Sequence, residues 1–312
     1  MAGGGESDGS SARVDVLMIG SGEYTTGYGK ESAKSDKGAG VVALVMFDLR
    51  RRGLVGRVGL CGTNGAKMPA IRAHMAEKIG GAYPASDLDL SLETFPADGD
   101  RDATAYLGAL DAFRGGVATV FTPDETHFDI AMACVERGVH VLLAKPPVMT
   151  LKEHQLLAEA AARHNVFVMT DVHKRFDPVY VDARDRIRAA GAMSFFNAYM
   201  SQPKRQLQTF AAWVGKSDTD ISYYLNSHHV DFSEWVWRGV ARPVRVTAMA
   251  ASGVADSVLG LDKKSDSEDT APTTGRTLGA ALSGWRCTLL PGSPLRRTCI
   301  RSSGSLPWGR VE

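Results

Sequence analysis

The sequence predicts an α/β fold, with a doubly wound parallel sheet in the first half of the chain and a second α/β domain after it. Short apolar runs alternate with helical stretches along the first half, which is the pattern of repeated β–α units. The first run ends in Gly20-Ser21-Gly22, and a later run ends in Lys145. Because right-handed crossovers bring the carboxyl ends of parallel strands to one edge, we expect these loops to share a rim.

The predicted strands are continuous apolar runs, as in strands that a parallel sheet buries on both faces. Helix boundaries are indicated by Thr150, which suits an N-cap, by residues 124–126, which place carboxylates in a first turn, and by Gly138, which stops a helix. The predicted strands are residues 14–19, 58–61, 117–121, 139–143 and 166–170, and the predicted helices are residues 41–52, 69–79, 103–113, 127–137 and 151–164.

The loop after the first strand has the composition of a pyrophosphate-binding turn. Gly20 allows a tight turn, and Gly22 lets backbone N–H groups approach phosphate oxygens. Thr25 stands where the usual pattern has a third glycine, and the next strong helical segment begins only at residue 41. The sequence therefore predicts a phosphate loop that is longer than usual, with no helix directly after the glycines. An ordinary strand-to-loop turn is the alternative, since two such glycines are common by chance.

Lys145 places an ammonium group where a strand ends. Ligand crevices of open α/β sheets lie outside the carboxyl ends of the strands, so this position favours contact with a ligand. Pro146 and Pro147 follow it and prevent a helix from starting at once, and the first of them can also hold a cis bond. The alternative is a solvated surface lysine that closes a strand.

Five motifs in this order resemble the Gfo/Idh/MocA family of glucose–fructose oxidoreductase and inositol dehydrogenase-like enzymes. They are Gly20-x-Gly22, Thr122-Pro123-x-x-x-His127, Ala144-Lys145-Pro146, residues 171–176, and His228-His229-Val230-Asp231. The resemblance covers about residues 13–255, and the ordered set is more specific than any one motif. It implies a Rossmann domain that binds NAD or NADP. It also implies a second domain whose open, mostly antiparallel sheet carries a sugar site on one face and often an oligomer interface on the other.

The resemblance implies three catalytic residues. Lys145 matches the family's lysine, with Ala144 in place of a glutamate, and His228 matches its histidine. Tyr224 stands where the family often has an aspartate. A tyrosine, with a reference pKa of about 10, is a poor base at neutral pH. We therefore expect His228 to accept the proton and Lys145 to stabilise the developing alkoxide, in hydride transfer between nicotinamide and a secondary alcohol or carbonyl of a sugar, cyclitol or related polyol.

The cofactor is expected to be NADP or NAD. The second strand is followed by residues 62–65, which supply no acid for the ribose hydroxyls, whereas Lys67 or Arg72 can meet a 2′-phosphate. This favours NADP. The basic residues 173–175 border the cleft or form a solvated loop. The predicted cofactor contacts are Gly20, Ser21, Gly22, Tyr24, Thr25, Asn64, Thr122, Pro123, His127, Lys145 and Arg175.

The sequence also fits other hypotheses about function. The tyrosine at position 224 and an unusual C-terminal region also fit a catalytically inactive NAD(P)-binding regulatory protein or a truncated family member. A third hypothesis is a reductase of an unsaturated or tetrapyrrole-like substrate. The pair His228-His229 can also be structural, with one ring packed and the other solvated.

The expected domains are a disordered N-terminus at residues 1–12, the Rossmann domain at 13–146, the second domain at 147–255, and an irregular or disordered tail at 256–312. Strands are predicted at residues 194–199 and 244–250, and a helix at residues 223–238. After about residue 254 no period of 2 or 3.6 is sustained. An altered reading frame or mis-joined exon, or else a lineage-specific tail, explains this change. The second sheet is expected to be incomplete.

The composition excludes several classes of function. A formal charge of +1 and the lack of a basic stripe argue against a nucleic-acid partner. The four cysteines lack C-x-x-C spacing, so neither a metal site nor a disulfide framework is indicated. No run reaches the ~18 apolar residues of a membrane span, and the N-terminus lacks the apolar core of a signal peptide. We expect a cytoplasmic protein with a small-molecule sugar or polyol substrate, which forms a homo-oligomer by family analogy.

Overall fold

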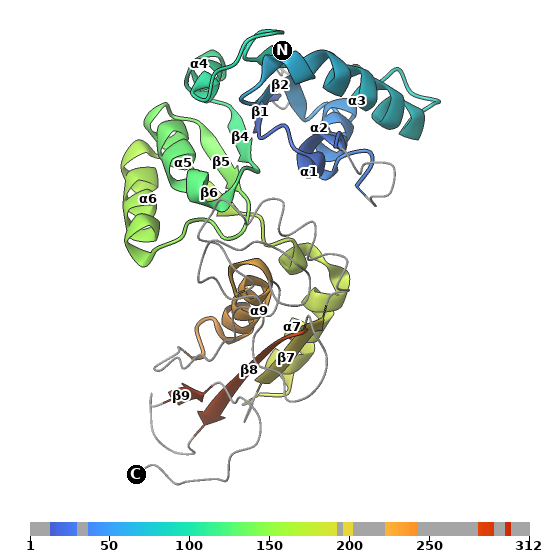
Figure 1. Cartoon of the computed structure of the whole chain (residues 1–312). Coiled ribbons are helices and arrows are strands. Elements are labelled where there is room, and N and C mark those ends of the chain that lie inside the picture. The colour runs from blue at the N-terminus through green and yellow to red at the C-terminus, as the bar shows by residue number, and fades with distance from the viewer. Residues whose placement is uncertain are drawn as a thin grey trace, which may run out of the picture. The chain divides into compact units, whose positions relative to one another are not determined.

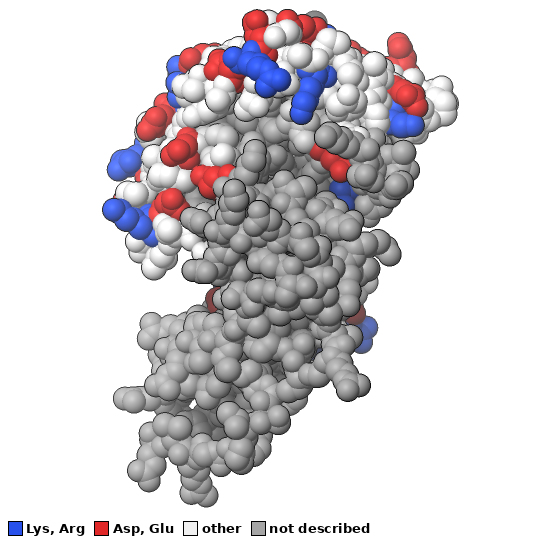
Figure 2. Space-filling view, in the orientation of Figure 1, with Lys and Arg blue, Asp and Glu red and all other residues white. Residues whose placement is uncertain are grey.

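The computed structural model describes residues 13–29, 37–191, 196–201, 222–241, 280–289 and 297–300 (Figure 1). The chain divides into two compact units, Met1–Thr170 and Asp171–Glu312. On the face of the first unit shown in Figure 2, Lys and Arg side chains are interspersed with Asp and Glu side chains, in keeping with a formal charge near zero.

The first unit is built on a six-stranded, all-parallel sheet with the strand order β3-β2-β1-β4-β5-β6. This is the doubly wound order, in which the direction of winding reverses between β1 and β4. The prediction of a parallel sheet is confirmed, and β3 adds a strand that the sequence did not indicate. The strands are β1 Val14–Ile19, β2 Val55–Cys61, β3 Glu93–Phe95, β4 Val117–Val120, β5 His140–Leu143 and β6 Val168–Thr170.

Helices cover both faces of this sheet (Figure 1). Alternate residues of β1 point to opposite faces, so Leu17 and Ile19 pack in one apolar cluster while Val16 and Met18 pack in another. The first cluster includes side chains of α4, α5 and α6, and the second includes side chains of α2 and α3. The helices and turns are α1 Glu23–Thr26, α2 Val41–Arg51, η2 Gly65–Lys67, α3 Met68–Ala82, α4 Ala105–Ala112, η3 Asp124–Thr126, α5 His127–Glu136 and α6 Leu151–His164.

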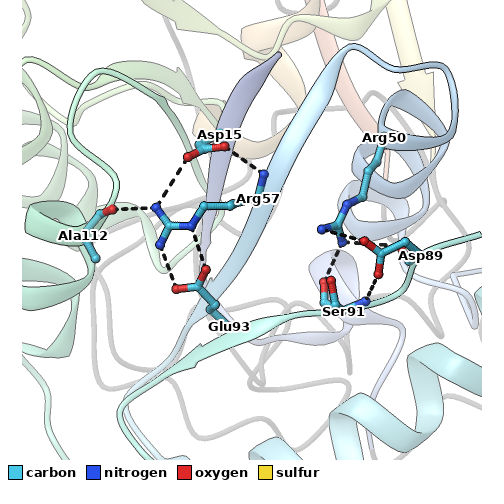
Figure 3. A network of polar contacts seen from close by, with 7 residues as sticks. All are labelled: Asp15, Arg50, Arg57, Asp89, Ser91, Glu93 and Ala112. Carbon is cyan, nitrogen blue, oxygen red and sulfur yellow. Dashed lines mark hydrogen bonds and ion pairs between the residues drawn. The ribbon is translucent and has the colours of Figure 1, made fainter.

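Near the amino-terminal ends of the strands, one arginine joins three of them (Figure 3). The guanidinium of Arg57 on β2 donates hydrogen bonds to both carboxylate oxygens of Glu93 on β3, at 2.8 and 2.9 Å. The backbone N–H of Arg57 donates to Asp15 on β1 at 2.8 Å. The Arg57 guanidinium holds the pKa of Glu93 below its ordinary value. This network fixes the edge of the sheet that lies opposite the predicted ligand loops.

The second unit contains a three-stranded antiparallel sheet in the order β7-β8-β9. Phe196 on β7 packs against Phe232 on α9, with ring centroids 6.0 Å apart. The helix predicted at residues 223–238 is confirmed, and it opens with a π-helical turn. The elements are η4 His173–Phe176, α7 Pro178–Ala189, β7 Phe196–Ser201, η5 Ser222–Asn226, α9 Ser227–Trp237, β8 Ala280–Leu289 and β9 Arg297–Ile300.

The domain organisation differs from the sequence-based prediction in two places. The first unit extends to Thr170 and not to residue 146, because β6 pairs with β5 in the parallel sheet. Strands β8 and β9 lie within residues 256–312, where we expected an irregular tail. The strand predicted at residues 244–250 and the N-terminal residues 1–12 lie outside the described residues. None of the helices in the described ranges is long and apolar enough to cross a membrane.

The start of α6 carries a capping box that offers a test of this local structure. The Thr150 hydroxyl accepts a hydrogen bond from the Glu153 backbone N–H at 3.2 Å, and the Glu153 carboxylate accepts one from the Thr150 N–H at 2.9 Å. Thr150→Ala should lower the free energy of unfolding by about 1 kcal/mol. Chemical denaturation followed by circular dichroism measures the change, with the exposed neighbour Lys152→Ala as control. Equal stability of the two variants would contradict the cap.

Candidate active site

The two glycines of the first loop have different surroundings. Gly20 follows β1 with φ +111°, and a Cβ on it would lie 2.1 Å from the carbonyl oxygen of Phe121 at the end of β4. No side chain fits there. Gly22 has φ −74°, and a Cβ on it would meet no atom within 4 Å. Gly20 thus permits the close packing of β1 and β4, whereas Gly22 leaves open space at the rim of the sheet.

A short helix does follow the glycines, so the prediction of none is wrong. Helix α1 starts at Glu23, directly after Gly22, and the next helix α2 starts after Gly40. Gly27 and Gly40 lie at the junction of the two helices, since a Cβ on Gly40 would be 2.5 Å from the Thr25 carbonyl oxygen and one on Gly27 would be 2.5 Å from the Gly40 nitrogen. The sequence signal for this junction is the small-residue cluster Gly38-Ala39-Gly40, which directly precedes α2.

Two residues of α1 differ in their access to a ligand. Tyr24 is exposed, and its ring stacks on Phe121 with centroids 5.3 Å apart and planes at 20°. Thr25 is 1% exposed. A direct contact of the Thr25 side chain with the cofactor, which we had predicted, is therefore ruled out by burial. Thr25 stands where the motif usually has its third glycine, and its carbonyl oxygen lies beside Gly40 at the start of α2.

The loop after β2 contacts the loop after β1. A Cβ on Gly62 would lie 2.6 Å from the Ser21 hydroxyl oxygen, so a larger residue at position 62 would displace Ser21. Asn64 caps η2, because its side-chain oxygen accepts a hydrogen bond from the Ala66 N–H at 3.2 Å. Because the cap uses that oxygen as an acceptor, the side-chain NH₂ of Asn64 is the group that can donate a hydrogen bond to a ribose hydroxyl.

His127 connects the loops that follow β4 and β5. The ring is fully buried, with Nδ1 2.9 Å from the carbonyl oxygen of Pro146 and Nε2 3.0 Å from that of Thr122. Burial excludes the direct cofactor contact that we predicted for His127. The ring instead positions the Thr122-Pro123 loop and the loop of Lys145. Lys145 itself is half-buried, and its bond to Pro146 is cis.

The remaining first-unit residues that the sequence assigned to the site lie at the carboxyl ends of four strands. They are Gly20, Ser21, Gly22 and Tyr24 after β1, Asn64 after β2, Thr122 and Pro123 after β4, and Lys145 after β5. Because all strands of this sheet are parallel, these ends form one rim. The rim includes the switch point between β1 and β4, where doubly wound folds bind nucleotides.

The sequence also named two cations for a 2′-phosphate. Lys67 is exposed at the end of η2. Arg72 on α3 is paired with Asp98, a residue that sequence reasoning missed because nothing in its local pattern connects it with Arg72. Among the described residues, no group of three or more His, Cys, Asp and Glu side chains is arranged to hold a metal ion.

The second unit brings the predicted histidines to α9. Both His228 and His229 are 8% exposed, so the alternative of one packed and one solvated ring is wrong. The His228 ring meets the His173 ring in an edge contact, with centroids 5.0 Å apart at 67°. Tyr224 lies before His228 in the π-helical turn η5 and is half-buried against Leu225. The histidine and the tyrosine are thus on continuous helical backbone.

Arg175 forms an ion pair within the second unit. Its Nε and Nη2 donate to the two carboxylate oxygens of Asp231, at 2.9 and 2.5 Å. This bidentate pair joins η4 to α9. The assignment of Arg175 to the cofactor site stays a prediction, since the Arg175 side chain is 32% exposed beside its charged partner. The pair also fixes the turn that carries His173 beside His228.

His229 should make stability depend on pH. Burial and, to a smaller extent, the positive charge of Lys174 together lower the pKa of His229 from 6.5 to about 4. The unfolded chain therefore binds the proton first as pH falls from 6.5 to 4, so folding loses stability across that window, by about 3 kcal/mol in total. Melting followed by tryptophan fluorescence measures this, since Trp235 and Trp237 lie on the same helix. His229→Phe should flatten the pH dependence between 4 and 6.5; an unchanged slope would contradict the assignment.

Comparisons with known proteins relate part of the chain to one oxidoreductase family. Residues 109–172 match the family model GFO_IDH_MocA, described as an oxidoreductase family with an NAD-binding Rossmann fold. Scyllo-inositol 2-dehydrogenase (NADP(+)) IolW of Bacillus subtilis is 28% identical over 142 residues, which is 45% of this chain and 39% of that protein. Trans-1,2-dihydrobenzene-1,2-diol dehydrogenase of Xenopus laevis is 34% identical over 115 residues, which is 36% of this chain and 31% of that protein.

A solved structure shows the same fold. UDP-N-acetylglucosamine 3-dehydrogenase GnnA of Acidithiobacillus ferrooxidans matches with a TM-score of 0.52 at 18% identity, over 95% of this chain and 71% of that one. The first unit thus has the Rossmann fold. Part of the chain is similar to the Gfo/Idh/MocA oxidoreductase family, the resemblance that the ordered motifs predicted. The chain matches about two fifths of the length of the Bacillus relative.

Proposed function

We propose that the chain is an NAD(P)-dependent oxidoreductase that transfers hydride between a nicotinamide cofactor and a secondary alcohol or carbonyl of a sugar, cyclitol or related polyol. The observation that carries the proposal is the convergence of the glycine loop, the Thr122-Pro123 loop and Lys145 on one rim of the parallel sheet. Relatives named as dehydrogenases of an inositol and of a cyclic diol support the substrate class.

The rim fits a dinucleotide. The open space beside Gly22 lets a pyrophosphate approach the backbone N–H groups that follow β1. Ser21 and Tyr24 flank this space, Asn64 and Lys67 follow β2 on the side expected for the ribose, and Thr122 and Pro123 follow β4. When bound, the nicotinamide ring supplies the hydride acceptor or donor. We retain NADP as the preferred cofactor because Lys67 is exposed at the ribose side and no acid follows β2 directly.

The chain's own residues have three tasks in this proposal. His228 accepts the hydroxyl proton, and the ammonium of Lys145 stabilises the negative charge that develops on the oxygen. Tyr224 donates a hydrogen bond to the hydroxyl oxygen. His127 holds the loop of Lys145 in the first unit. In the second unit the Arg175–Asp231 pair holds η4, so that His173 packs against His228 and restricts its ring.

Gly22→Ala tests the cofactor site without disturbing the fold. A methyl group at position 22 meets no protein atom, so the melting temperature should stay unchanged. The same methyl group should obstruct the pyrophosphate and weaken binding of NADP and NAD by about tenfold or more. Isothermal titration measures the dissociation constants. Gly108→Ala on α4 is the matched control, since a Cβ there also meets no atom within 4 Å. An unchanged affinity in Gly22→Ala would refute the site.

Lys145→Ala separates catalysis from cofactor binding. Loss of the ammonium should lower kcat by about 100-fold or more, because a charge that stabilises the transition state is removed. The cofactor dissociation constant should change less than about threefold, since the glycine loop is intact. A panel of inositols, polyols and aldoses with both cofactors is the assay, and Lys78→Ala on α3 is the control lysine. Undiminished turnover would remove Lys145 from the mechanism.

A second candidate is a catalytically inactive, NAD(P)-binding regulatory protein. This candidate is favoured by Tyr224, because a tyrosine is a poorer proton acceptor at neutral pH than the aspartate of the family pattern. Cofactor binding without turnover on the same panel would support it. We also propose that the protein is located in the cytoplasm, because the four cysteines are scattered and suit a reducing compartment. We further propose a homo-oligomer that forms through the antiparallel sheet of the second unit.

A further inference from the structure

We infer that Asp98 is a specificity-determining residue for the cofactor. Its carboxylate holds the guanidinium of Arg72 and so withholds that cation from the 2′-phosphate, the group that distinguishes NADP from NAD. The inference rests on the proposed function and refines it at the ribose side of the site. Asp98 acts against NADP in this account, while Lys67 acts for it.

Arg72 lies where a 2′-phosphate contact is expected. It belongs to α3, the helix that follows the loop after β2. Its Nη1 donates a hydrogen bond to the Thr94 hydroxyl on β3 at 2.9 Å, and Thr94 is the register partner of Leu60 near the end of β2. The guanidinium therefore lies at the carboxyl ends of β2 and β3. Rossmann domains recognise the ribose after β2, and a nearby arginine there accommodates a 2′-phosphate.

The structure shows this arginine already engaged. Nη1 of Arg72 donates to Oδ1 of Asp98 at 3.0 Å, and Nη2 donates to Oδ2. The pairing raises the pKa of Arg72 and lowers that of Asp98, so both groups are charged at neutral pH. A bidentate carboxylate occupies the same two donors that a phosphate would use. Asp98 therefore competes with the cofactor for one guanidinium.

The backbone fixes Asp98 in this place. The loop after β3 lies against the loop after β2, because the Gly65 N–H donates to the Asp100 carbonyl at 2.8 Å and the Asp102 N–H donates to the Thr63 carbonyl at 3.2 Å. A Cβ on Gly65 would lie 1.9 Å from the Ala97 carbonyl oxygen, so the contact depends on glycine. Since the Asp98 side chain takes no part in these bonds, replacing its carboxylate should free Arg72 without releasing the loop.

Charge adds to this competition. A 2′-phosphate entering the rim meets the negative carboxylate of Asp98, whereas the 2′-hydroxyl of NAD carries no charge. Arg72 and Asp98 are 36% and 44% exposed at their side chains, so salt screens the repulsion. The effect of Asp98 on NADP should therefore be larger at low ionic strength, and its effect on NAD should be small at any salt concentration.

Dissociation constants of the full-length chain for NADP and NAD, measured by titration at low and at physiological salt, test the inference. Asp98→Asn should tighten NADP binding about tenfold and leave NAD within about twofold. Adding Arg72→Gln to Asp98→Asn should abolish the gain. Arg72→Gln alone should not weaken NADP binding, because Arg72 is withheld in the native chain. The matched control is Asp89→Asn, which removes a carboxylate paired with Arg50 at 2.9 Å at the opposite end of the sheet (Figure 3).

An unchanged ratio of the two dissociation constants in Asp98→Asn would overturn the inference while leaving the proposed function intact. Weaker NADP binding in Arg72→Gln alone would overturn it as well, since Arg72 would then already contact the phosphate. If the native chain binds neither cofactor, the proposed function fails and the inference fails with it. Failure of the proposed function is seen in the native chain with both cofactors, whereas failure of the inference alone is seen in the Asp98 and Arg72 variants with NADP.

Discussion

The site depends on one close approach between two strands. The carbonyl oxygen of Phe121 lies 2.1 Å from the place where a Cβ of residue 20 would be, and the Phe121 N–H donates to the Ile19 carbonyl at 2.9 Å. Only glycine, at φ +111°, satisfies both conditions. This contact places the end of β1 directly beside the end of β4. The glycine loop, the stacked ring of Tyr24 and the Thr122 loop follow from that placement.

The other loops of the rim are joined by the same means. Gly65 lets the loop after β3 lie on the loop after β2, and Gly62 leaves room for Ser21. His127, fully buried, joins the loops after β4 and β5 through two carbonyl oxygens. Because backbone contacts and one buried ring hold the loops, accessible side chains of the rim can differ without disturbing the loops. The half-buried Lys145 and the exposed Lys67 are two such side chains.

Sequence patterns predicted the sheet because buried parallel strands are continuous apolar runs, and they predicted the rim because glycine and Lys145 directly follow such runs. Sequence patterns did not predict the shortest elements or the contacts between residues far apart in the chain. Strand β3 has three residues and α1 has four, too few to show a period. Burial of Thr25 and His127, and the pairing of Arg175 with Asp231, depend on residues that lie far apart in the sequence. Burial removes the expected side-chain contacts of Thr25 and His127 with a cofactor, since a buried group is not available to a ligand.

A crystal structure of the chain grown with NADP would show whether the dinucleotide binds at this rim. We expect the pyrophosphate within hydrogen-bonding distance of backbone N–H groups between residues 21 and 23, with the ribose 2′-phosphate near Lys67 after β2. We also expect the nicotinamide on the side of Lys145. A dinucleotide bound away from the carboxyl ends of β1 and β4, or a glycine loop closed over the space beside Gly22, would contradict these expectations.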